Sequence, residues 1–307
     1  MNVDNRSSKG LRCAGRAARV IIVIAALTGW LIPGPASADL PSGTGSFVYV
    51  DKANNPDKPV TVWYHRPEGT DNTVPVVFVM HGVRRNGDTY RNNWIDLADA
   101  NKFLVVVPEF SKKAFPGSWR YNMGNVFYAA GGRKPVDEWA FTYIENIFET
   151  LRRDHRLTAE KYDIFGHSAG SQFVHRMVLF MPNARIRTAI AANAGWYTMV
   201  DPKVAMPYGL AETETDTARI RDALGTRLIV LLGEADNDPN HRYLRRASEA
   251  MAQGAHRFER GQIFFATARK FAEGIGARFA WELETVPGVG HSNRKMAPAA
   301  AKLLGRR

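Results

Sequence analysis

Cysteine is nearly absent from this sequence, and its one cysteine, Cys13, lies close to the N-terminus. The chain beyond residue 13 can therefore form no disulfide, and it can carry neither a catalytic thiol nor a thiolate metal site. Long apolar runs are lacking too. The N-terminal run Val20–Ile32 has 13 residues, too few for a comfortable membrane span. No internal repeat or low-complexity segment follows it, which excludes a repeat protein and indicates one globular unit.

The first 38 residues have the pattern of a signal peptide. A basic N-terminal region precedes the apolar run Val20–Ile32, and Ala36-Ser37-Ala38 then forms a small-residue cleavage site. No arginine pair precedes the apolar run, so the pattern is typical of general export. We therefore predict a signal peptide over residues 1–38, a mature N-terminus at Asp39 and a secreted or periplasmic protein. The alternative is an uncleaved membrane anchor.

The chain has few acidic residues for its many basic ones, and its formal net charge is +11. The Lys and Arg residues are scattered, without a dense basic tract or a patch interleaved with aromatics. This pattern argues against a nucleic-acid partner and indicates a solvated basic surface that favours acidic substrates or anionic envelope material. The sequence does not indicate an oligomeric state.

Residues 39–307 are enough for one large α/β domain with a full core. The inner strand candidates are continuous apolar runs, typical of parallel strands buried on both faces, whereas the first two alternate and favour antiparallel pairing. Helical stretches separate the later strands, which predicts a mostly parallel, eight-stranded, doubly wound sheet with helices on both faces. The eight candidates are Ser46–Asp51, Val60–His65, Val74–Met80, Phe103–Pro108, Tyr162–Phe165, Thr188–Asn193, Arg227–Leu232 and Arg278–Val286.

Two further segments bear on the fold and the cleft. The apolar spacing in Asp137–Arg153 predicts a helix with acids in its first turn and arginines in its last. Ser111–Pro135 is rich in glycine and aromatics and has no regular pattern. A connection of this length is either a wall of the substrate cleft or a packed surface loop. Together with Trp196-Tyr197, its aromatics predict an aromatic-lined cleft.

The strongest motif is Gly166-His167-Ser168-Ala169-Gly170, which follows the apolar strand candidate at Tyr162 and precedes an apolar helical stretch. A serine hydroxyl is a poor nucleophile unless it is exposed, aimed and paired with a base. A sharp strand-to-helix turn lifts the serine above the sheet, and the flanking glycines allow the close backbone approach that such a turn needs. We therefore predict that Ser168 is a nucleophile.

An acid and a histidine should follow the nucleophile in chain order. The strand candidate Arg227–Leu232 leads into a loop with three carboxylates, of which we favour Asp236, since it has room to curl back toward a base. Glu234 and Asp238 remain open alternatives. His291 lies in a glycine-rich loop after the last strand candidate, where its ring can reach back across the top of the sheet.

Acyl transfer also needs two backbone N–H groups aimed at the developing oxyanion. One is expected from Ala169, directly after the nucleophile. The other is expected from the loop after the third strand, where Gly82 permits close approach and either Val83 or Arg84 supplies the N–H. We favour Val83.

These residues together resemble the α/β-hydrolase superfamily over essentially the whole chain after residue 38. Within it the sequence is most similar to secreted esterases akin to polyhydroxybutyrate depolymerases and feruloyl or acetylxylan esterases. The resemblance implies an α/β-hydrolase fold with a Ser-His-Asp triad. It rests on four motifs after strands three, five, seven and eight: His81-Gly82, Gly166-His167-Ser168-Ala169-Gly170, Gly233-Glu234-Ala235-Asp236 and Gly290-His291.

The expected activity is hydrolysis of a small or polymeric carboxylic ester through an acyl-enzyme, without a metal or an organic cofactor. Ser168 attacks the carbonyl, His291 transfers the proton, and Asp236 orients the imidazole. Two alternatives remain open. One is amide or peptide hydrolysis by the same triad, and the other is a non-catalytic binding protein on a hydrolase scaffold. The sequence names neither the acyl group nor the alcohol.

Overall fold

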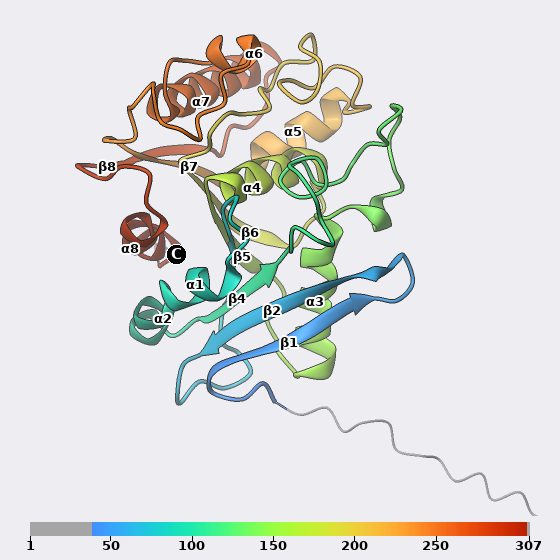
Figure 1. Cartoon of the computed structure of the whole chain (residues 1–307), viewed down its shortest axis with the longest axis vertical. Coiled ribbons are helices and arrows are strands. Elements are labelled where there is room, and N and C mark those ends of the chain that lie inside the picture. The colour runs from blue at the N-terminus through green and yellow to red at the C-terminus, as the bar shows by residue number, and fades with distance from the viewer. Residues whose placement is uncertain (1–38, 306–307) are drawn as a thin grey trace, which may run out of the picture. The chain divides into compact units, whose positions relative to one another are not determined.

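The computed structural model describes residues 39–305. The predicted signal peptide and its cleavage site lie outside the described residues. None of the helices within 39–305 has the length and apolar character that crossing a membrane requires. Figure 1 shows one twisted sheet with helices on its two faces and the hairpin of β1 and β2 at one edge.

The sheet has eight strands in the order β1-β2-β4-β3-β5-β6-β7-β8. Each predicted strand overlaps an observed one, and the predicted fold class is confirmed. The last strand is shorter than predicted because the chain before it turns Trp281 into the core, where the indole donates to the carbonyl of Ala223 at 3.0 Å. The strands are β1 Gly43–Asp51, β2 Asn55–Arg66, β3 Val76–Met80, β4 Leu104–Glu109, β5 Tyr162–His167, β6 Ile186–Ala192, β7 Leu228–Gly233 and β8 Glu282–Val286.

Strand direction follows the hydrophobic pattern. The strand β1 alternates between more and less exposed residues and pairs antiparallel with β2, which in turn pairs antiparallel with β4. All five residues of β3 are buried, and β3 pairs parallel with β4 and β5. The strands from β5 to β8 are also parallel. Their carboxyl ends therefore share one edge, which is where such sheets bind ligands.

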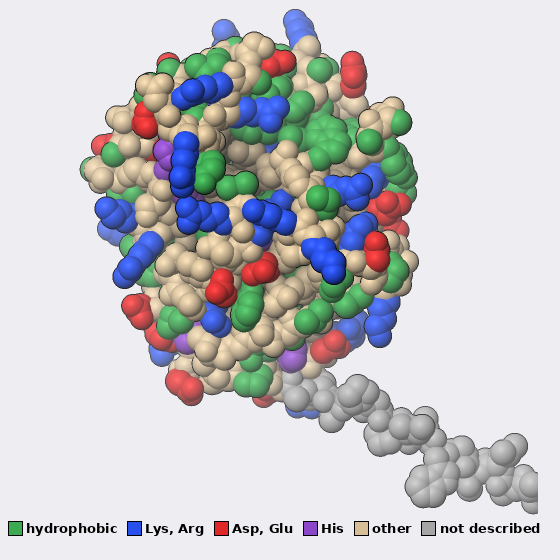
Figure 2. All heavy atoms as spheres, viewed as in Figure 1, with side chains coloured by type: hydrophobic (Ala, Val, Ile, Leu, Met, Phe, Trp, Pro, Cys, Tyr) green, Lys and Arg blue, Asp and Glu red, His purple; other side chains and the backbone are tan. Residues whose placement is uncertain are grey.

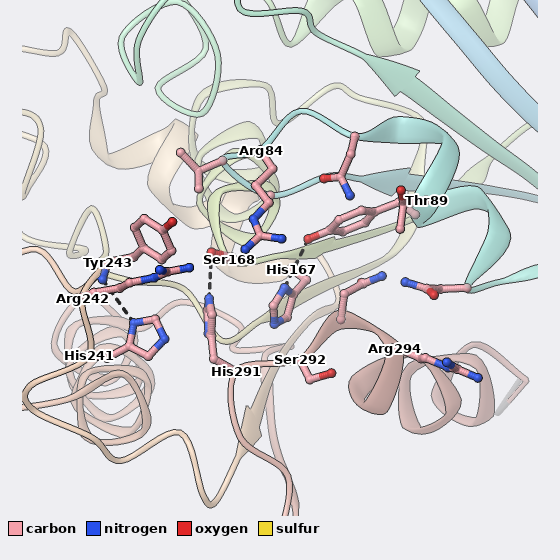
Figure 3. A pocket seen from close by; sticks show the side chains of 16 residues that line it. Arg84, Thr89, His167, Ser168, His241, Arg242, Tyr243, His291, Ser292 and Arg294 are labelled. Atoms are coloured by element: carbon pink, nitrogen blue, oxygen red, sulfur yellow. Dashed lines mark hydrogen bonds between the residues drawn. The ribbon is translucent and has the colours of Figure 1, made fainter.

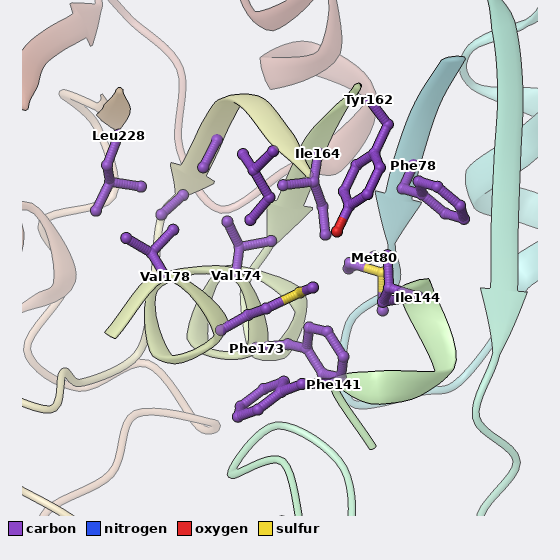
Figure 4. Close-up of a cluster of buried hydrophobic side chains, with 14 of the residues drawn as sticks. Phe78, Met80, Phe141, Ile144, Tyr162, Ile164, Phe173, Val174, Val178 and Leu228 are labelled. Carbon is purple, nitrogen blue, oxygen red and sulfur yellow. The ribbon is translucent and has the colours of Figure 1, made fainter. Parts of the chain in front are cut away.

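Helices cover both faces of the sheet. The larger core lies between the sheet and α3, α4, α5 and α7, and Figure 4 shows Val174 of α4 directed toward Ile164 of β5. A second core lies beneath α2 and α8 on the other face. The helices are α1 Gly87–Asn92, α2 Ile95–Asn101, α3 Thr142–Asp154, α4 Ala169–Phe180, α5 Thr217–Gly225, α6 Ser248–Met251, α7 Arg257–Gly274 and α8 Asn293–Leu304, with a short 3-10 turn at Val136–Glu138.

The predicted helix Asp137–Arg153 is wrong at its beginning. The 3-10 turn Val136–Glu138 ends at Trp139, whose backbone is extended, and α3 begins three residues later. Trp139 is fully buried, and its indole donates to the carbonyl of Lys134 at 2.9 Å. Burial of this large side chain therefore interrupts the helix. The acid in the first turn of α3 is Glu145, not Asp137.

The segment 111–135 is a packed support, not a cleft wall. It contains no helix or regular strand, apart from one bridge between Phe127 and Arg133. Tyr121 is buried and stacks on His81 with ring centroids 4.7 Å apart, and its hydroxyl donates to the carbonyl of His81 at 2.7 Å. The segment thus holds the loop after β3 from behind.

Candidate active site

Ser168 lies in the sharp turn between β5 and α4. Its backbone has φ 60° and ψ −115°, a conformation that a residue with a side chain rarely adopts. The flanking glycines make the turn possible: a Cβ at Gly166 would lie 2.1 Å from the carbonyl oxygen of Gly170, and one at Gly170 would lie 2.0 Å from the carbonyl oxygen of Met80. The turn therefore has the strained geometry of a nucleophile elbow.

The structure brings Ser168, His291 and Asp236 into one hydrogen-bonded chain. The Oγ of Ser168 lies 3.0 Å from Nε2 of His291, and Nδ1 of His291 lies 2.7 Å from Oδ2 of Asp236. The three residues follow β5, β8 and β7, whose carboxyl ends meet at one edge. Figure 3 shows the imidazole of His291 directed at Ser168. This order suits proton transfer from the hydroxyl to the ring.

The two other carboxylates of the loop after β7 point elsewhere. Glu234 accepts a hydrogen bond from the hydroxyl of Thr285 at 2.8 Å, and Asp238 accepts one from the amide of Asn240 at 2.8 Å. Asp236 is turned inward because its amide donates to the carbonyl of Gly233 at 3.0 Å, closing a tight turn. Only 4% of Asp236 is exposed, whereas Asp238 is exposed.

The loop after β3 lies against Ser168. A Cβ at Gly82 would be 3.8 Å from the Cβ of Ser168, and the amide of Arg85 donates to the carbonyl of Gly82 at 3.1 Å. This turn brings Val83 and Arg84 to the same cavity as Ser168. On the other side, Ala169 is the first residue of α4, and the first N–H groups of a helix have no intrahelical acceptor.

Two buried groups hold this loop in place. The guanidinium of Arg85 donates to the carbonyls of Phe110 at 2.7 Å and Gly117 at 2.8 Å, and it lies 4.0 Å from the ring centre of Tyr121. The Nε2 of His81 accepts the amide of Phe110 at 3.0 Å. Burial, aided by the neighbouring Arg85 charge, lowers the pKa of His81 to about 3. The loop is therefore fixed by a neutral histidine and a buried cation.

Ser168 and His291 open into a cavity of about 380 Å³. Three arginines from three elements line it, Arg84, Arg242 and Arg294, and no aspartate or glutamate is among its lining residues. In Figure 3 the side chains of Arg84 and Arg242 approach the region of Ser168 from different sides, whereas Arg294 lies farther along α8. The cavity beside Ser168 is therefore positively charged. Other Lys and Arg side chains lie on the face of the molecule that Figure 2 shows, several of them across its middle.

The expected aromatic cleft takes another form. Trp196 and Tyr197 are buried and do not line this cavity, and neither does any residue of 111–135. The aromatic side chains that do line it are Tyr90 and Tyr243. The predicted aromatic-lined cleft is therefore wrong, because arginines line this cavity in place of those aromatics.

Two histidines that the sequence analysis left aside flank the ring of His291. The ring of His167 lies 4.7 Å from that of His291, and the ring of His241 lies 5.5 Å from it. Burial lowers the pKa of His167 well below its ordinary value, with the nearby His291 and Arg257 acting in the same direction. Burial also lowers the pKa of His241, again with Arg257. Both neighbours are therefore neutral near pH 7.

The sequence analysis missed these neighbours and the cavity arginines because each arises from a contact between distant segments. Arg84 was considered only for its backbone amide. Arg242 carries no motif of its own, and Arg257 lies 21 residues from the acid that it contacts. Within one sequence, the scattered positive charge is the only signal of the cationic cavity.

Comparisons with known proteins agree with the fold. No family model matches the chain, and no curated protein matches it. Among solved structures, poly(aspartic acid) hydrolase-1 from Sphingomonas sp. KT-1 is 44% identical, with a TM-score of 0.83, over 86% of this chain and 99% of that one. LpqC, a poly(3-hydroxybutyrate) depolymerase from Bordetella parapertussis, is 35% identical, with a TM-score of 0.81, over 86% of this chain and 90% of that one.

A more distant structure shares the fold alone. An S-formylglutathione hydrolase from Agrobacterium tumefaciens is 17% identical, with a TM-score of 0.55, over 88% of this chain and 96% of that one. The sheet and the two closer similarities define an α/β hydrolase. The chain belongs to the family of α/β hydrolases that includes poly(aspartic acid) hydrolase-1 and the poly(3-hydroxybutyrate) depolymerase LpqC.

Proposed function

We propose that this protein is an exported serine hydrolase that cleaves carboxylic esters through an acyl-enzyme. The observation that carries the proposal is the unbroken chain of hydrogen bonds from Asp236 through His291 to Ser168. Export is proposed from the pattern of the first 38 residues, which precede the domain.

The geometry suits the two halves of an acyl transfer. The Nε2 of His291 accepts the proton of Ser168 as Oγ attacks the ester carbonyl, and it returns that proton to the leaving alcohol. A water then enters, and the same ring takes its proton as the acyl-enzyme is hydrolysed. Asp236 accepts a hydrogen bond from Nδ1–H of His291 throughout, which fixes the tautomer and stabilises the imidazolium.

The oxyanion of each tetrahedral intermediate is proposed to lie between the amides of Val83 and Ala169. Both residues lie next to Ser168, one on the loop after β3 and one at the beginning of α4. The N-terminal end of a helix carries partial positive charge, so α4 favours the developing negative oxygen. Loss of one such donor typically costs about 10²–10³ in kcat.

The cavity favours a substrate that carries carboxylates. Arg84 and Arg242 lie beside the nucleophile, and no acidic side chain lines the cavity to compensate them. A guanidinium binds a carboxylate through two parallel N–H bonds, which favours anionic over neutral acyl chains. The proposed substrate is therefore an ester with a carboxylate near the scissile bond, either small or part of a polymer.

Amide hydrolysis is the second candidate, and one comparison favours it. The relative at 44% identity is a hydrolase of poly(aspartic acid), a polyamide with one carboxylate on each residue. The relative at 35% identity acts on a polyester, poly(3-hydroxybutyrate). The same triad can attack either bond, and the arginine-lined cavity suits the anionic polymer better.

The first test separates an enzyme from a binding protein. A fluorophosphonate probe should label the native protein, and Ser168→Ala should abolish both labelling and p-nitrophenyl acetate hydrolysis while keeping the thermal melt. An active, folded Ser168→Ala protein would refute the triad. Replacing the nucleophile of such a triad typically costs about 10⁶ in kcat.

The second test addresses the substrate. Mono-(p-nitrophenyl) succinate and p-nitrophenyl butyrate have acyl chains of equal length and differ by a terminal carboxylate. We expect the anionic ester to be favoured at least about tenfold in kcat/KM, since a charge-assisted hydrogen bond contributes about 1.5–3 kcal/mol. Arg84→Met and Arg242→Met should reduce this preference. Arg246→Met is the control, because Arg246 is exposed on the same loop as Arg242 and does not line the cavity.

Two polymers decide the bond type. Release of amines from poly(aspartic acid) at a higher kcat/KM than release of acid from poly(3-hydroxybutyrate) would favour the amide candidate. The opposite order would favour the ester. Equal preference for succinyl and butyryl esters in the native protein would refute the role proposed for the arginines.

A further inference from the structure

A buried arginine contacts the carboxylate of the triad. Arg257 is 2% exposed, and its Nη1 lies 3.3 Å from Oδ1 of Asp236. Its Nη2 donates to Nδ1 of His241 at 3.1 Å. One guanidinium therefore connects the acid of the triad to a histidine of the cavity.

Both burial and the N-terminal end of a helix disfavour a cation at the position of Arg257. Arg257 is the first residue of α7, an 18-residue helix, and the N-terminal end of a helix repels positive charge. A second buried arginine, Arg260, lies in the same first turn. Burial lowers the pKa of Arg257, and the charge of Asp236 opposes that shift. A residue whose charge is disfavoured by its local surroundings is expected at a functional site.

The two oxygens of Asp236 have different partners. Oδ2 faces Nδ1 of His291 at 2.7 Å, and Oδ1 faces Arg257. A carboxylate held at one oxygen alone can rotate about its last torsion, which is broad for aspartate. The guanidinium at the second oxygen restricts that rotation and so keeps Oδ2 aimed at His291.

The second contact of Arg257 extends this restraint to the cavity wall. His241 lies 5.5 Å from the ring of His291, on the side facing the cavity. The next two residues, Arg242 and Tyr243, also line the cavity. The amide of Tyr243 donates to the same Nδ1 of His241 at 3.2 Å. The loop that presents these side chains is therefore anchored to Arg257.

We propose that Arg257 is a positioning residue of the active site, which fixes the orientation of Asp236 and ties the loop carrying His241 to the triad. The inference rests on the proposed function, because it assumes that Asp236 is the working acid. It goes beyond that function by assigning a role to a residue that touches neither the substrate nor the nucleophile.

A double-mutant cycle tests the inference. The part of the effect of Arg257 on kcat that acts through Asp236 requires a carboxylate at residue 236. It should therefore vanish once that acid is replaced by its amide, which cannot stabilise the imidazolium. We expect Arg257→Met to lower kcat at least about tenfold and Asp236→Asn at least about a hundredfold. The kcat of the double variant should then lie within about threefold of Asp236→Asn alone.

Arg260→Met is the matched control. Arg260 is a buried arginine of the same helical turn, and it donates to the carbonyls of Gly195 and Gly254, with no contact to the triad. Its loss should lower thermal stability as that of Arg257 does. Its effect on kcat, whatever its size, should multiply with that of Asp236→Asn, because the two sites are independent.

Arg257→Lys keeps the experiment informative if the methionine variant does not fold. The ammonium of lysine keeps the charge. It lacks the planar fork of the guanidinium, which reaches Asp236 and His241 at the same time. We expect a folded protein with a partial loss of kcat that again disappears in the Asp236→Asn background.

The outcomes separate the inference from the function on which it rests. If the kcat effects of the Arg257 and Asp236 variants multiply, as those of the Arg260 control should, that outcome would overturn the positioning role and leave the triad assignment intact. Full activity of Arg257→Met would do the same. Full activity of Asp236→Asn would instead refute the acid assignment of the proposed function.

Discussion

Acidification should destabilise this protein through His81, which lies beneath the loop that faces Ser168. The Nε2 of His81 accepts the amide of Phe110 at 3.0 Å, and Nδ1 donates to the carbonyl of Gly82 at 3.1 Å. These two bonds fix one neutral tautomer. A second proton would have to enter at Nε2, which is already occupied as an acceptor.

The size of the effect follows from linkage. Burial, then the charge of Arg85, lowers the pKa of His81 from 6.5 to about 3 in the folded protein. Because the folded value lies below the unfolded one, the unfolded chain takes up the proton first on acidification. Stability is therefore present above pH 6.5 and is lost as the pH falls from 6.5 toward 3. Between pH 7 and pH 5 the loss from His81 alone is about 2 kcal/mol.

The assay is urea unfolding of the native protein and of His81→Gln at pH 7 and pH 5. Glutamine is chosen because its side-chain oxygen can accept the amide of Phe110 but does not titrate. The free energy of unfolding should fall by about 2 kcal/mol less in His81→Gln than in the native protein. The buried His167 and His175 are present in both proteins, so their contributions cancel in the difference.

The control is the interval from pH 7 to pH 8, where His81 is mostly neutral in both states and the two proteins should change nearly alike. An identical loss of stability from pH 7 to pH 5 in both proteins would refute the reasoning, since His81 would then titrate equally in the folded and unfolded chains. A larger loss in His81→Gln would refute it as well.

Three further predictions concern the acid, the leader and the elbow. Asp236→Asn should lower kcat at least about a hundredfold, a loss of roughly 2.7 kcal/mol of transition-state stabilisation, whereas Glu234→Gln and Asp238→Asn should each lower kcat less than about tenfold. A larger loss in either of the last two variants than in Asp236→Asn would overturn the choice of acid. N-terminal sequencing of exported protein should begin at Asp39, and membrane-bound protein that retains Met1 would show an anchor instead. Gly170→Ala should prevent correct folding of the elbow, since a Cβ there meets a backbone carbonyl oxygen at 2.0 Å, and a folded variant with full activity on p-nitrophenyl acetate would contradict that contact.

Much of the architecture could be predicted from local pattern. Continuous apolar runs such as β3 mark strands buried on both faces, and the structure confirms them as parallel. The elbow was predictable because the strained backbone at Ser168 requires glycine at the two flanking positions, and glycine is visible in sequence. The position of His291 followed from its loop after the last strand.

Other features depended on contacts that no local pattern encodes. The beginning of α3 was misplaced because burial of Trp139 interrupts the helix, and that burial depends on segments distant in sequence. The segment 111–135 proved to be a support for His81, since the stacking of Tyr121 exists only in the folded chain. Its composition alone did not distinguish a cleft wall from a packed loop.

The sequence by itself determined the class of this protein, because chain order and glycine placement are enough to specify a serine elbow on a parallel sheet. Only the tertiary structure decided which of three neighbouring carboxylates faces His291, since that choice depends on how the turn after Gly233 closes. It also gathered Arg84 and Arg242 at one cavity and placed Arg257 against Asp236. Charges far apart in the chain act together only when folding brings them within a few ångströms, where water screens them less.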